Sequence, residues 1–372
     1  MGLQHDFDAV VVGAGAVGLA TGYALARRGL SVAVLEKERA IGQGVSSRNS
    51  EVIHGGVYYP TGSLRARLCV AGRRMLYPFL ERRGVAYDRC GKLVVATDEA
   101  EVARVEAVAS QAEINGVEAL AWMTGEEAMR LEPALHAVAA LHSPESGVFD
   151  SHGYMRALQW EIEALGGAVA LGAPFEAAQP LEAGGFRVRV GGNDPVALTC
   201  RFLVTAAGLD AQAAAARIEG FPADRIPKLR LGKGNYFALV GKAPFSRLVY
   251  PPPVPGALGV HYRRDLGGQA RFGPDLEYVE AIDYRVGSER LPGFYDYIRR
   301  YWPGLPDGAL TPDYVGIRPK IHGPGEPQPD FRLDAADVHG LPGLVAMFGI
   351  ESPGLTASLA IGEEVAARLG LD

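Results

Sequence analysis

A glycine pattern near the start of the chain has the spacing to hold the phosphates of a dinucleotide. Residues 13–18 read Gly-Ala-Gly-Ala-Val-Gly, which is the G-x-G-x-x-G pattern. Its first two glycines let the backbone turn and approach a pyrophosphate, and the third lets a helix pack closely on a strand. Farther along, the carboxylate of Glu36 can accept hydrogen bonds from ribose hydroxyls and would repel a 2′-phosphate. The pattern therefore predicts a dinucleotide site that disfavours NADP.

The segments around these glycines predict the βαβ unit that such a site needs. Residues 8–12 form a short apolar run typical of a buried parallel strand, and residues 31–35 form another that ends at Glu36. Between them, residues 18–28 have helical spacing and stop at Gly29. The phosphates would lie at the N-terminus of this helix, where unpaired N–H groups favour anions.

Composition excludes several classes of protein. The chain has 372 residues, 48% hydrophobic and 22% charged, which is typical of a globular protein and not of a disordered one. The net charge is −6 without a long basic run, so no nucleic-acid partner is predicted. Three scattered cysteines predict neither a disulfide framework nor a metal site, and they favour a cytoplasmic protein. No apolar run reaches the ~18 residues of a transmembrane helix, and the N-terminus lacks the basic residues of a signal peptide; peripheral docking at the inner membrane stays open.

The rest of the chain predicts further helices and strands. Helices are expected at 64–82, with a kink or break at Pro78, at 99–115, at 154–165, with Ser151 as the N-cap, and from about 355 to 369. Strands are expected at 92–97, 168–171, 186–190, 201–206 and 344–347. Residues 225–320 instead carry short alternating runs rich in proline, glycine and tyrosine, which are typical of an antiparallel sheet.

These patterns predict two interleaved domains. Gly22 extends the glycine pattern to G-x-G-x-x-G-x-x-x-G, and the unit stands at the N-terminus; both features resemble FAD enzymes more than NAD dehydrogenases. The first domain is therefore expected to be an α/β Rossmann-like domain for FAD, and the second an α+β substrate domain built on a mainly antiparallel sheet. The predicted FAD-binding domain comprises residues 1–85, 145–222 and 321–372. The predicted substrate-binding domain comprises residues 86–144 and 223–320.

Several strings resemble one branch of a flavoenzyme superfamily. Residues 47–59 read Ser-Arg-Asn-Ser-Glu-Val-Ile-His-Gly-Gly-Val-Tyr-Tyr, residues 63–69 read Ser-Leu-Arg-Ala-Arg-Leu-Cys, residues 316–320 read Gly-Ile-Arg-Pro-Lys, and residues 350–359 read Ile-Glu-Ser-Pro-Gly-Leu-Thr-Ala-Ser-Leu. With the N-terminal unit and Val-Thr-Ala-Ala-Gly at 204–208, they resemble the L-2-hydroxyglutarate dehydrogenase/oxidase branch of the D-amino-acid oxidase/glycine oxidase superfamily. The similarity extends from the first strand to the last helix. It implies an FAD-dependent oxidoreductase that oxidises a small acidic 2-hydroxy acid, with L-2-hydroxyglutarate as the expected substrate.

The resemblance leaves some features open. Residues 232–237 read Gly-Lys-Gly-Asn-Tyr-Phe where the family has an Arg-Gly-Glu-Tyr-Tyr-like string, so the exact hydroxy acid is not fixed. FAD-dependent glycerol-3-phosphate dehydrogenases share the Ile-His-Gly-Gly and Gly-x-Arg-Pro strings. An amino-acid or amine oxidase on the same fold and a non-enzymatic flavin-binding regulator remain alternatives. The electron acceptor is expected to be oxygen or a membrane quinone.

Oxidising a hydroxy acid requires a hydride acceptor, a base for the hydroxyl proton and a cation for the carboxylate. Flavin supplies the first, and a neutral histidine suits the second because its unperturbed pKa is about 6.5. His54 lies in the loop that the resemblance places against the flavin, and His261 lies in a predicted strand at 259–262. Either histidine is a candidate base.

Arg318 is the predicted carboxylate anchor. A planar guanidinium binds a carboxylate through two parallel hydrogen bonds, and the following Pro319 favours an extended backbone. A dicarboxylate needs a second anchor. The candidates for it are Tyr58, Tyr59, Lys233, Arg271 and Lys320.

The predicted FAD contacts come from the glycine pattern, the polar loop at 46–50 and the C-terminal glycine loop. The helix after that last loop is expected to point its N-terminus at the flavin and to stabilise negative charge there. A carboxylate at Glu351 opposes this expectation. The predicted contacts are Gly13, Ala14, Gly15, Ala16, Val17, Gly18, Glu36, Lys37, Ser46, Ser47, Arg48, Asn49, Ser50, Phe175, Ala206, Ala207, Gly208, Gly349, Ile350, Glu351, Ser352, Pro353, Gly354, Leu355 and Thr356.

Overall fold

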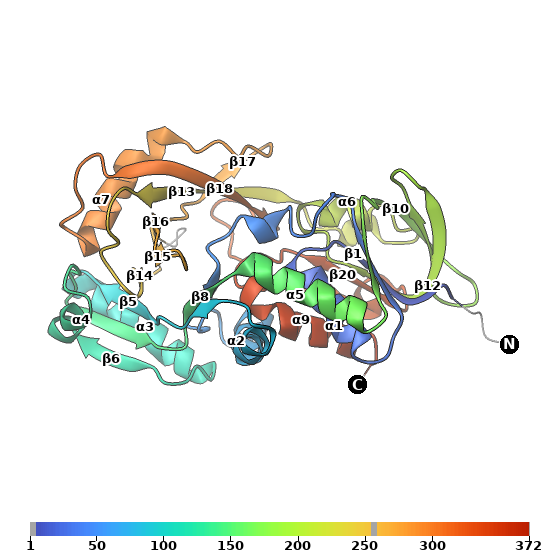
Figure 1. Ribbon diagram of the computed structural model, residues 1–372, viewed down its shortest axis with the longest axis horizontal. Coiled ribbons are helices and arrows are strands. Elements are labelled where there is room, and N and C mark those ends of the chain that lie inside the picture. The colour runs from blue at the N-terminus through green and yellow to red at the C-terminus, as the bar shows by residue number, and fades with distance from the viewer. Residues whose placement is uncertain (1–4, 254–258, 372) are drawn as a thin grey trace.

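Two large sheets, each covered by its own helices, form the two halves of an elongated molecule (Figure 1). The computed structural model describes residues 5–253 and 259–371. One half holds a sheet of eight strands with a parallel centre, and the other a largely antiparallel sheet of nine strands. This confirms the predicted combination of an α/β Rossmann-like fold with an α+β fold. The residue boundaries of the two domains stay a prediction.

The eight-stranded sheet takes its strands from the beginning, middle and end of the chain. Its parallel centre has the order β9-β2-β1-β12-β20, and β10, β11 and β19 extend it through antiparallel pairs. Val10 lies between Ala33 and Leu203 in this register, and all three side chains are buried. The strands are β1 (Phe7–Val12), β2 (Val32–Glu36), β9 (Ala168–Leu171), β10 (Phe175–Pro180), β11 (Phe186–Val190), β12 (Val196–Thr205), β19 (Arg332–Asp334) and β20 (Leu344–Phe348).

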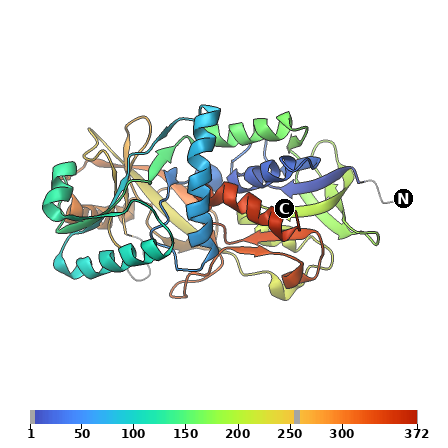
Figure 2. The same cartoon turned by 90° about the horizontal axis from the view of Figure 1, so that it is seen from below.

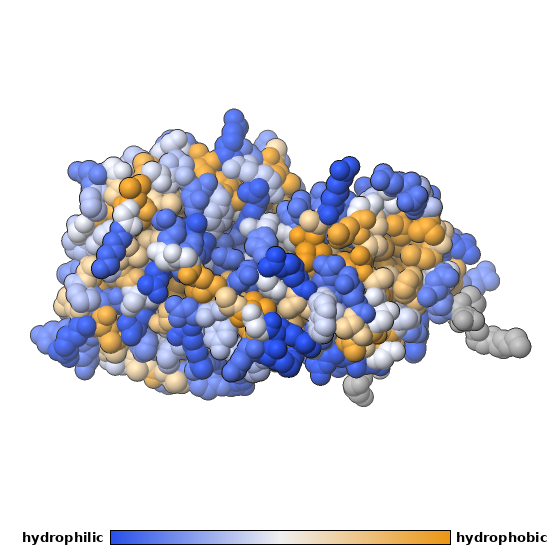
Figure 3. Space-filling view, viewed as in Figure 1, coloured by the Kyte–Doolittle hydropathy of each residue, from blue (hydrophilic) through white to orange (hydrophobic). Residues whose placement is uncertain are grey.

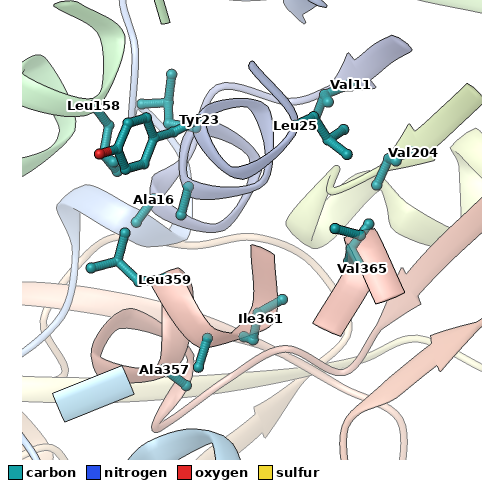
Figure 4. Close-up of a cluster of buried hydrophobic side chains, with 14 of the residues drawn as sticks. Val11, Ala16, Tyr23, Leu25, Leu158, Val204, Ala357, Leu359, Ile361 and Val365 are labelled. Carbon is teal, nitrogen blue, oxygen red and sulfur yellow. The ribbon is translucent and has the colours of Figure 1, made fainter. Parts of the chain in front are cut away.

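Helices cover both faces of this sheet, which explains why its central strands are continuous apolar runs. On one face, α1 (Ala16–Ala26), α5 (Ser151–Ala164) and α9 (Gly354–Arg368) enclose a buried cluster. Figure 4 shows Tyr23 of α1 close to Leu158 of α5, with Leu359 of α9 below them. On the other face, the short helix α6 (Ala211–Ala215) packs its alanines on the sheet. A further short helix, α8 (Ala336–His339), follows β19.

The nine-stranded sheet forms a second hydrophobic core. Its main path has the order β17-β13-β16-β15-β14-β5-β7-β6, and β18 lies along β13. Aromatic side chains such as Phe237, Tyr262 and Phe294 fill the core beneath it. The strands are β5 (Lys92–Ala96), β6 (Ala121–Thr124), β7 (Ala139–Ser143), β13 (Arg230–Leu239), β14 (Leu248–Tyr250), β15 (Tyr262–Arg264), β16 (Ala270–Phe272), β17 (Glu277–Val279) and β18 (Leu310–Lys320). The helices of this half are α3 (Glu99–Ile114), α4 (Gly125–Leu131) and α7 (Leu291–Tyr301).

The long helix α2 (Leu64–Arg83) runs across the molecule between the two halves, as Figure 2 shows. Beside it lies a small sheet of β3 (Val52–Ile53), β4 (Tyr87–Asp88) and β8 (Gly147–Phe149). The helix packs closely on the first turn of α9: a Cβ atom at Gly72 would lie 2.5 Å from the carbonyl oxygen of Thr356. Only glycine therefore allows this approach.

Several details differ from the sequence prediction. The Asp150 carboxylate, not Ser151, caps α5, because it accepts a hydrogen bond of 2.8 Å from the amide of Gly153. Pro78 does not break α2; a proline removes a single helical hydrogen bond, and the buried side chains of Phe79 and Leu80 hold the helix in place beyond it. The predicted strand at 259–262 begins only at its last residue. Strand β10 was not predicted.

Hydrophilic and hydrophobic residues are mixed over the face seen in Figure 3, with a larger hydrophobic area over α6 and β10. Among the described residues, no helix combines the length and the apolar character needed to cross a membrane.

Candidate active site

One cavity of about 680 Å³ joins the glycine pattern to the predicted catalytic residues. Gly13 and Gly15 contribute to its wall, and so do His54, His261 and Arg318. Arg318 lies on a strand of the nine-stranded sheet, and the other four lie in loops directly before or after a strand or helix. The cavity thus combines a dinucleotide cradle with a proton acceptor and a cation.

The glycine pattern forms a close-packed cradle at the start of α1. A Cβ atom at Gly18 would overlap the carbonyl oxygen of Gly13, and one at Gly13 would lie 2.6 Å from the carbonyl oxygen of Ala206. The amide of Ala16 donates to Ser46 Oγ at 3.0 Å, which holds the polar loop against the helix N-terminus. Gly13 and Gly15 line the cavity without a side chain, so a pyrophosphate can approach the backbone there.

Glu36 is fixed at the end of β2 as the ribose site requires. Its Oε2 accepts a hydrogen bond of 2.9 Å from the amide of Ala14, and its Oε1 accepts one of 3.0 Å from Glu38. Each carboxylate oxygen can accept a second hydrogen bond, so ribose hydroxyls can still bind on the cavity side. The glycine cradle, the helix N-terminus and this carboxylate together fit FAD.

We expect Gly15→Val to abolish FAD binding. A Cβ atom at Gly15 would already lie 2.9 Å from Ser46 Oγ, and the branched side chain would fill the space of the pyrophosphate. The ratio of flavin to protein absorbance after purification measures the loss. Gly293→Val is the matched control, because a Cβ atom at that exposed position of α7 meets no atom within 4 Å. Full FAD content in Gly15→Val would contradict this position of the phosphate site.

His54 follows directly after β3 and is held by the start of α9. Its amide donates to Thr356 Oγ1 at 3.0 Å, and the Thr356 hydroxyl donates to the carbonyl of Val52 at 3.1 Å. The ring atom Nε2 lies 3.3 Å from Ser352 Oγ. Burial, followed by the charges of Lys92 and His261, lowers the pKa of His54 well below its usual value. The imidazole is therefore neutral at neutral pH and able to accept a proton.

His261 lies just before β15 and belongs to an aromatic group on the cavity wall. Its ring stacks on Tyr250, with 3.6 Å between the ring centroids and an interplanar angle of 12°. Tyr236, which also lines the cavity, stacks on Tyr314 at 4.3 Å. Burial raises the pKa of Tyr250 and of Tyr236, so both phenols stay protonated and can donate hydrogen bonds. The sequence did not predict either tyrosine as a site residue. The one available signal was the segment 232–237, which contains Tyr236 and differs from the string that the family has there.

Arg318 lies on β18 and contributes to the cavity wall. Its two terminal nitrogens donate to the carbonyl oxygen of Asp275 at 3.1 and 3.2 Å. The neighbouring strand β13 carries Gly234 beside it, where a Cβ atom would lie 3.0 Å from Nη2. The two bonds to Asp275 fix the plane of the guanidinium and leave further N–H donors for a carboxylate.

The five candidates for a second anchor do not contribute to the cavity wall. Lys233 Nζ lies 3.3 Å from the carboxylate of Asp283, and Arg271 is paired with Asp265 and Asp313. Lys320 is paired with Glu351, Tyr59 is buried, and Tyr58 is half-buried. Of the predicted FAD contacts, the wall includes all except Ala14, Gly18, Ser47 and Thr356.

The buried carboxylate of Glu351 is part of an ion-pair cluster. It accepts hydrogen bonds from Lys320 Nζ at 2.9 Å, from Arg65 at 3.2 Å and from Gln328 at 3.0 Å. Burial alone would raise the pKa of Glu351, but the charges of Lys320 and Arg65 outweigh burial and lower the pKa to about 2. Lys320 and Arg65 thus balance the negative charge of Glu351, which would otherwise work against the stabilisation of flavin by the N-terminus of α9. The cluster joins α2, β18 and the loop before α9.

We expect Glu351→Gln to reduce the free energy of unfolding by about 3 to 5 kcal/mol at pH 7, because two buried cations lose their partner. The folded pKa of about 2 lies below the ordinary 4.5, so the stabilisation is present above pH 4.5 and is lost as the pH falls towards 2. Urea denaturation at several pH values measures the free energy of unfolding. The difference in this free energy between Glu351→Gln and wild type should become smaller in acid. Glu126→Gln, at an exposed position of α4, is the control and should leave stability unchanged. Equal stability of wild type and Glu351→Gln at pH 7 would show that the ionised Glu351 does not stabilise the protein through Lys320 and Arg65.

Comparisons with known proteins agree with this geometry. A family model described as FAD dependent oxidoreductase matches residues 8–368. The mitochondrial L-2-hydroxyglutarate dehydrogenase of Arabidopsis thaliana is 41% identical, over 98% of this chain and 84% of that protein. The L-2-hydroxyglutarate dehydrogenase of Salmonella houtenae is 28% identical, over 98% and 93%.

Solved structures share the fold. The structure of the L-alpha-glycerophosphate oxidase of Mycoplasma pneumoniae with FAD bound has a TM-score of 0.86 and 23% identity, and the match covers 98% of this chain and 95% of that one. The glycine oxidase of Geobacillus kaustophilus has a TM-score of 0.79 and 21% identity, with 99% and 95% covered. Because the family model matches nearly the whole length of this chain, the chain belongs to the FAD dependent oxidoreductase family and is an enzyme that uses FAD.

Proposed function

We propose that the enzyme oxidises L-2-hydroxyglutarate to 2-oxoglutarate. The observation that carries the proposal is the single cavity whose wall holds the dinucleotide cradle, a neutral histidine and an arginine with free donors. These are the three groups that oxidation of a 2-hydroxy acid requires. The identity of 41% to a protein named for this substrate supports the choice among hydroxy acids.

Each cavity residue has a role in this proposal. FAD held by the glycine cradle and Glu36 would supply the hydride acceptor for the substrate carbon. Arg318 binds the carboxylate next to that carbon and sets the orientation of the substrate. His54 accepts the hydroxyl proton at Nε2, the ring atom that lies beside Ser352. The amide contact to Thr356 keeps the imidazole in place during the transfer. His261 remains the second candidate for the base.

Anaerobic visible spectra of the purified protein test the substrate. L-2-hydroxyglutarate should bleach the flavin absorbance, while the D-enantiomer, glycerol 3-phosphate, glycine and L-glutamate should leave it. Bleaching by an amino acid but not by the hydroxy acid would assign the cavity to amine oxidation. Flavin that none of these compounds reduces would contradict the proposed substrate.

We also propose that oxygen or a membrane quinone reoxidises the flavin. Relatives are named dehydrogenases, while a structural neighbour is named an oxidase. Reoxidation by air compared with reoxidation by a soluble quinone analogue separates the two. For the compartment, a cytoplasmic or peripheral inner-membrane location remains our proposal; the plant relative is named mitochondrial, and fractionation of the source cells decides.

A further inference from the structure

The cavity wall holds more than one cation, and the chemistry proposed above uses only one of them. Among the described residues, the lysines and arginines that line the cavity are Lys37, Arg48, Arg217 and Arg318. Arg318 binds the carboxylate next to the reacting carbon, but L-2-hydroxyglutarate has a second carboxylate at the far end of its carbon chain. A carboxylate that leaves water needs a cation or several donors in exchange. The five residues expected for this task do not line the cavity, so the partner is expected among the other three cations.

Lys37 and Arg217 belong to the half of the molecule that carries the glycine cradle. Lys37 follows directly after β2, and its Nζ donates to the carboxylate of Asp210 at 2.7 Å. Arg217 follows α6, and its Nη1 donates to the carbonyl oxygen of Phe175 at 3.3 Å. Both residues are thus held by elements of the eight-stranded half, and each has a partner there. Arg48 is the remaining cation.

Arg48 makes its contacts with the nine-stranded half instead. A Cβ atom at Gly316 of β18 would overlap the carbonyl oxygen of Arg48, so the backbones of these two residues touch. Gly316 and Arg318 lie two residues apart on this strand, which corresponds to about 7 Å and to the same face of the sheet. The backbone of Arg48 therefore lies close to the point from which Arg318 reaches the cavity. Two arginine side chains that start this close together can bind the two ends of a diacid the size of 2-hydroxyglutarate.

An aromatic ring holds the guanidinium of Arg48. Its central carbon Cζ lies 4.1 Å from the ring centroid of Tyr284, which follows β17 and also lines the cavity. Among the described residues, no carboxylate forms an ion pair with Arg48; that of Glu51, three residues farther along, lies 3.7 Å from Nη1 of Arg263. The contact with the ring is not a hydrogen bond to an acceptor oxygen, so the N–H donors of Arg48 remain for a carboxylate.

We propose that Arg48 binds the distal carboxylate of L-2-hydroxyglutarate and so determines a preference for dicarboxylic hydroxy acids. The proposal rests on the proposed oxidation of L-2-hydroxyglutarate, with Arg318 as the anchor of the other carboxylate. It replaces the expectation that Arg48 contacts FAD, because the contacts of Arg48 are with β18 and Tyr284 and not with the glycine cradle. Tyr284 is a positioning residue, since it acts on the substrate only through Arg48.

Arg48→Met tests the proposal, because methionine retains much of the aliphatic side chain and removes the charge. L-2-hydroxypentanoate is the matched substrate, since it has a methyl group in place of the distal carboxylate. The ratio of kcat/KM for L-2-hydroxyglutarate to that for L-2-hydroxypentanoate should fall by about 10- to 100-fold, as expected for the loss of a charge-assisted hydrogen-bonded pair. Arg318→Lys should lower both values together, because both substrates have the carboxylate that Arg318 binds. Arg130→Met, at an exposed position of α4, should leave the ratio unchanged.

Calorimetric titration of the FAD-loaded enzyme with the corresponding oxo acids gives a readout that does not depend on turnover. Wild type should bind 2-oxoglutarate more tightly than 2-oxopentanoate, and Arg48→Met should remove most of this difference in affinity. Tyr284→Leu should reduce the difference in the same direction by a smaller factor, about 2- to 5-fold, because the guanidinium loses its ring. This second variant decides the question if Arg48→Met does not fold.

A kcat/KM ratio and a difference in affinity that stay unchanged in Arg48→Met would overturn the proposal. Loss of FAD from this variant would also overturn it, since Arg48 would then belong to the cofactor site. The failure of the proposed function looks different: L-2-hydroxyglutarate would not reduce the flavin of the wild-type enzyme. The titrations of wild type and Arg48→Met with the two oxo acids would still report on Arg48.

Discussion

His54→Asn should slow flavin reduction by L-2-hydroxyglutarate by about 100-fold or more, because asparagine cannot accept the hydroxyl proton. In the wild-type enzyme the rate should be flat at neutral pH and fall only in acid. The sign follows from the pKa: a base works when unprotonated, and burial with the neighbouring charges places the pKa of His54 well below 6.5. Anaerobic stopped-flow reduction across pH measures both the rate and the acid limb, which should disappear in His54→Asn.

His261→Asn is the matched comparison, since both histidines line the same cavity. If His54 is the base, His261→Asn keeps the acid limb at a reduced amplitude. Loss of the acid limb in His261→Asn alone would transfer the role to His261. A wild-type rate and acid limb in both variants would remove both histidines from the proton transfer.

Arg318→Lys should retain FAD but lower kcat/KM for L-2-hydroxyglutarate by about 10- to 100-fold. Lysine keeps the charge, but it loses the planar fork that two bonds to the carbonyl of Asp275 hold in one orientation. Steady-state kinetics with a flavin spectrum of each preparation separates lost substrate binding from lost cofactor. Arg299→Lys, on α7 outside the cavity wall, should behave as wild type. An unchanged kcat/KM in Arg318→Lys would show that another cation binds the carboxylate.

The nucleotide half of the fold could be predicted because its signals are local. Gly18 and Glu36 belong to one βαβ unit, and the apolar runs before and after them read as strands in a buried parallel sheet. Strand β10 escaped prediction because Phe175–Pro180 contains a glutamate, a glutamine and a proline, and alternation there is weak. The antiparallel character of 225–320 was visible, but its register was not.

The partners of the site residues could not be predicted, because they are distant in sequence. His54 meets Ser352 and Thr356 only after α9 has packed beside β3. Glu351 conflicted with the expected helix N-terminus as long as Lys320 and Arg65 were unknown. Such pairings depend on tertiary packing, which leaves no periodic signal in the sequence.

The lysine at the start of β5 illustrates the same limit in another way. A lysine at the start of an apolar strand normally indicates an exposed end, yet Lys92 is fully buried between two tyrosines. Its two tyrosine neighbours come from residues 58 and 250, in separate parts of the chain. Only the assembled structure shows that the lysine lies over these two rings.

The close packing of α2 on α9 extends the demands of catalysis to a helix that never meets the substrate. Gly72 leaves no room for a methyl group against the backbone of Thr356 and Ala357, and Thr356 holds the amide of His54. In a Gly72→Ala variant the start of α9 would be displaced, and Thr356 would no longer hold His54 in place. The variant would lose activity although Gly72 does not line the cavity. In surveys of natural variation in related enzymes, a substitution at the position of Gly72 should therefore be grouped with substitutions in the loop that carries His54.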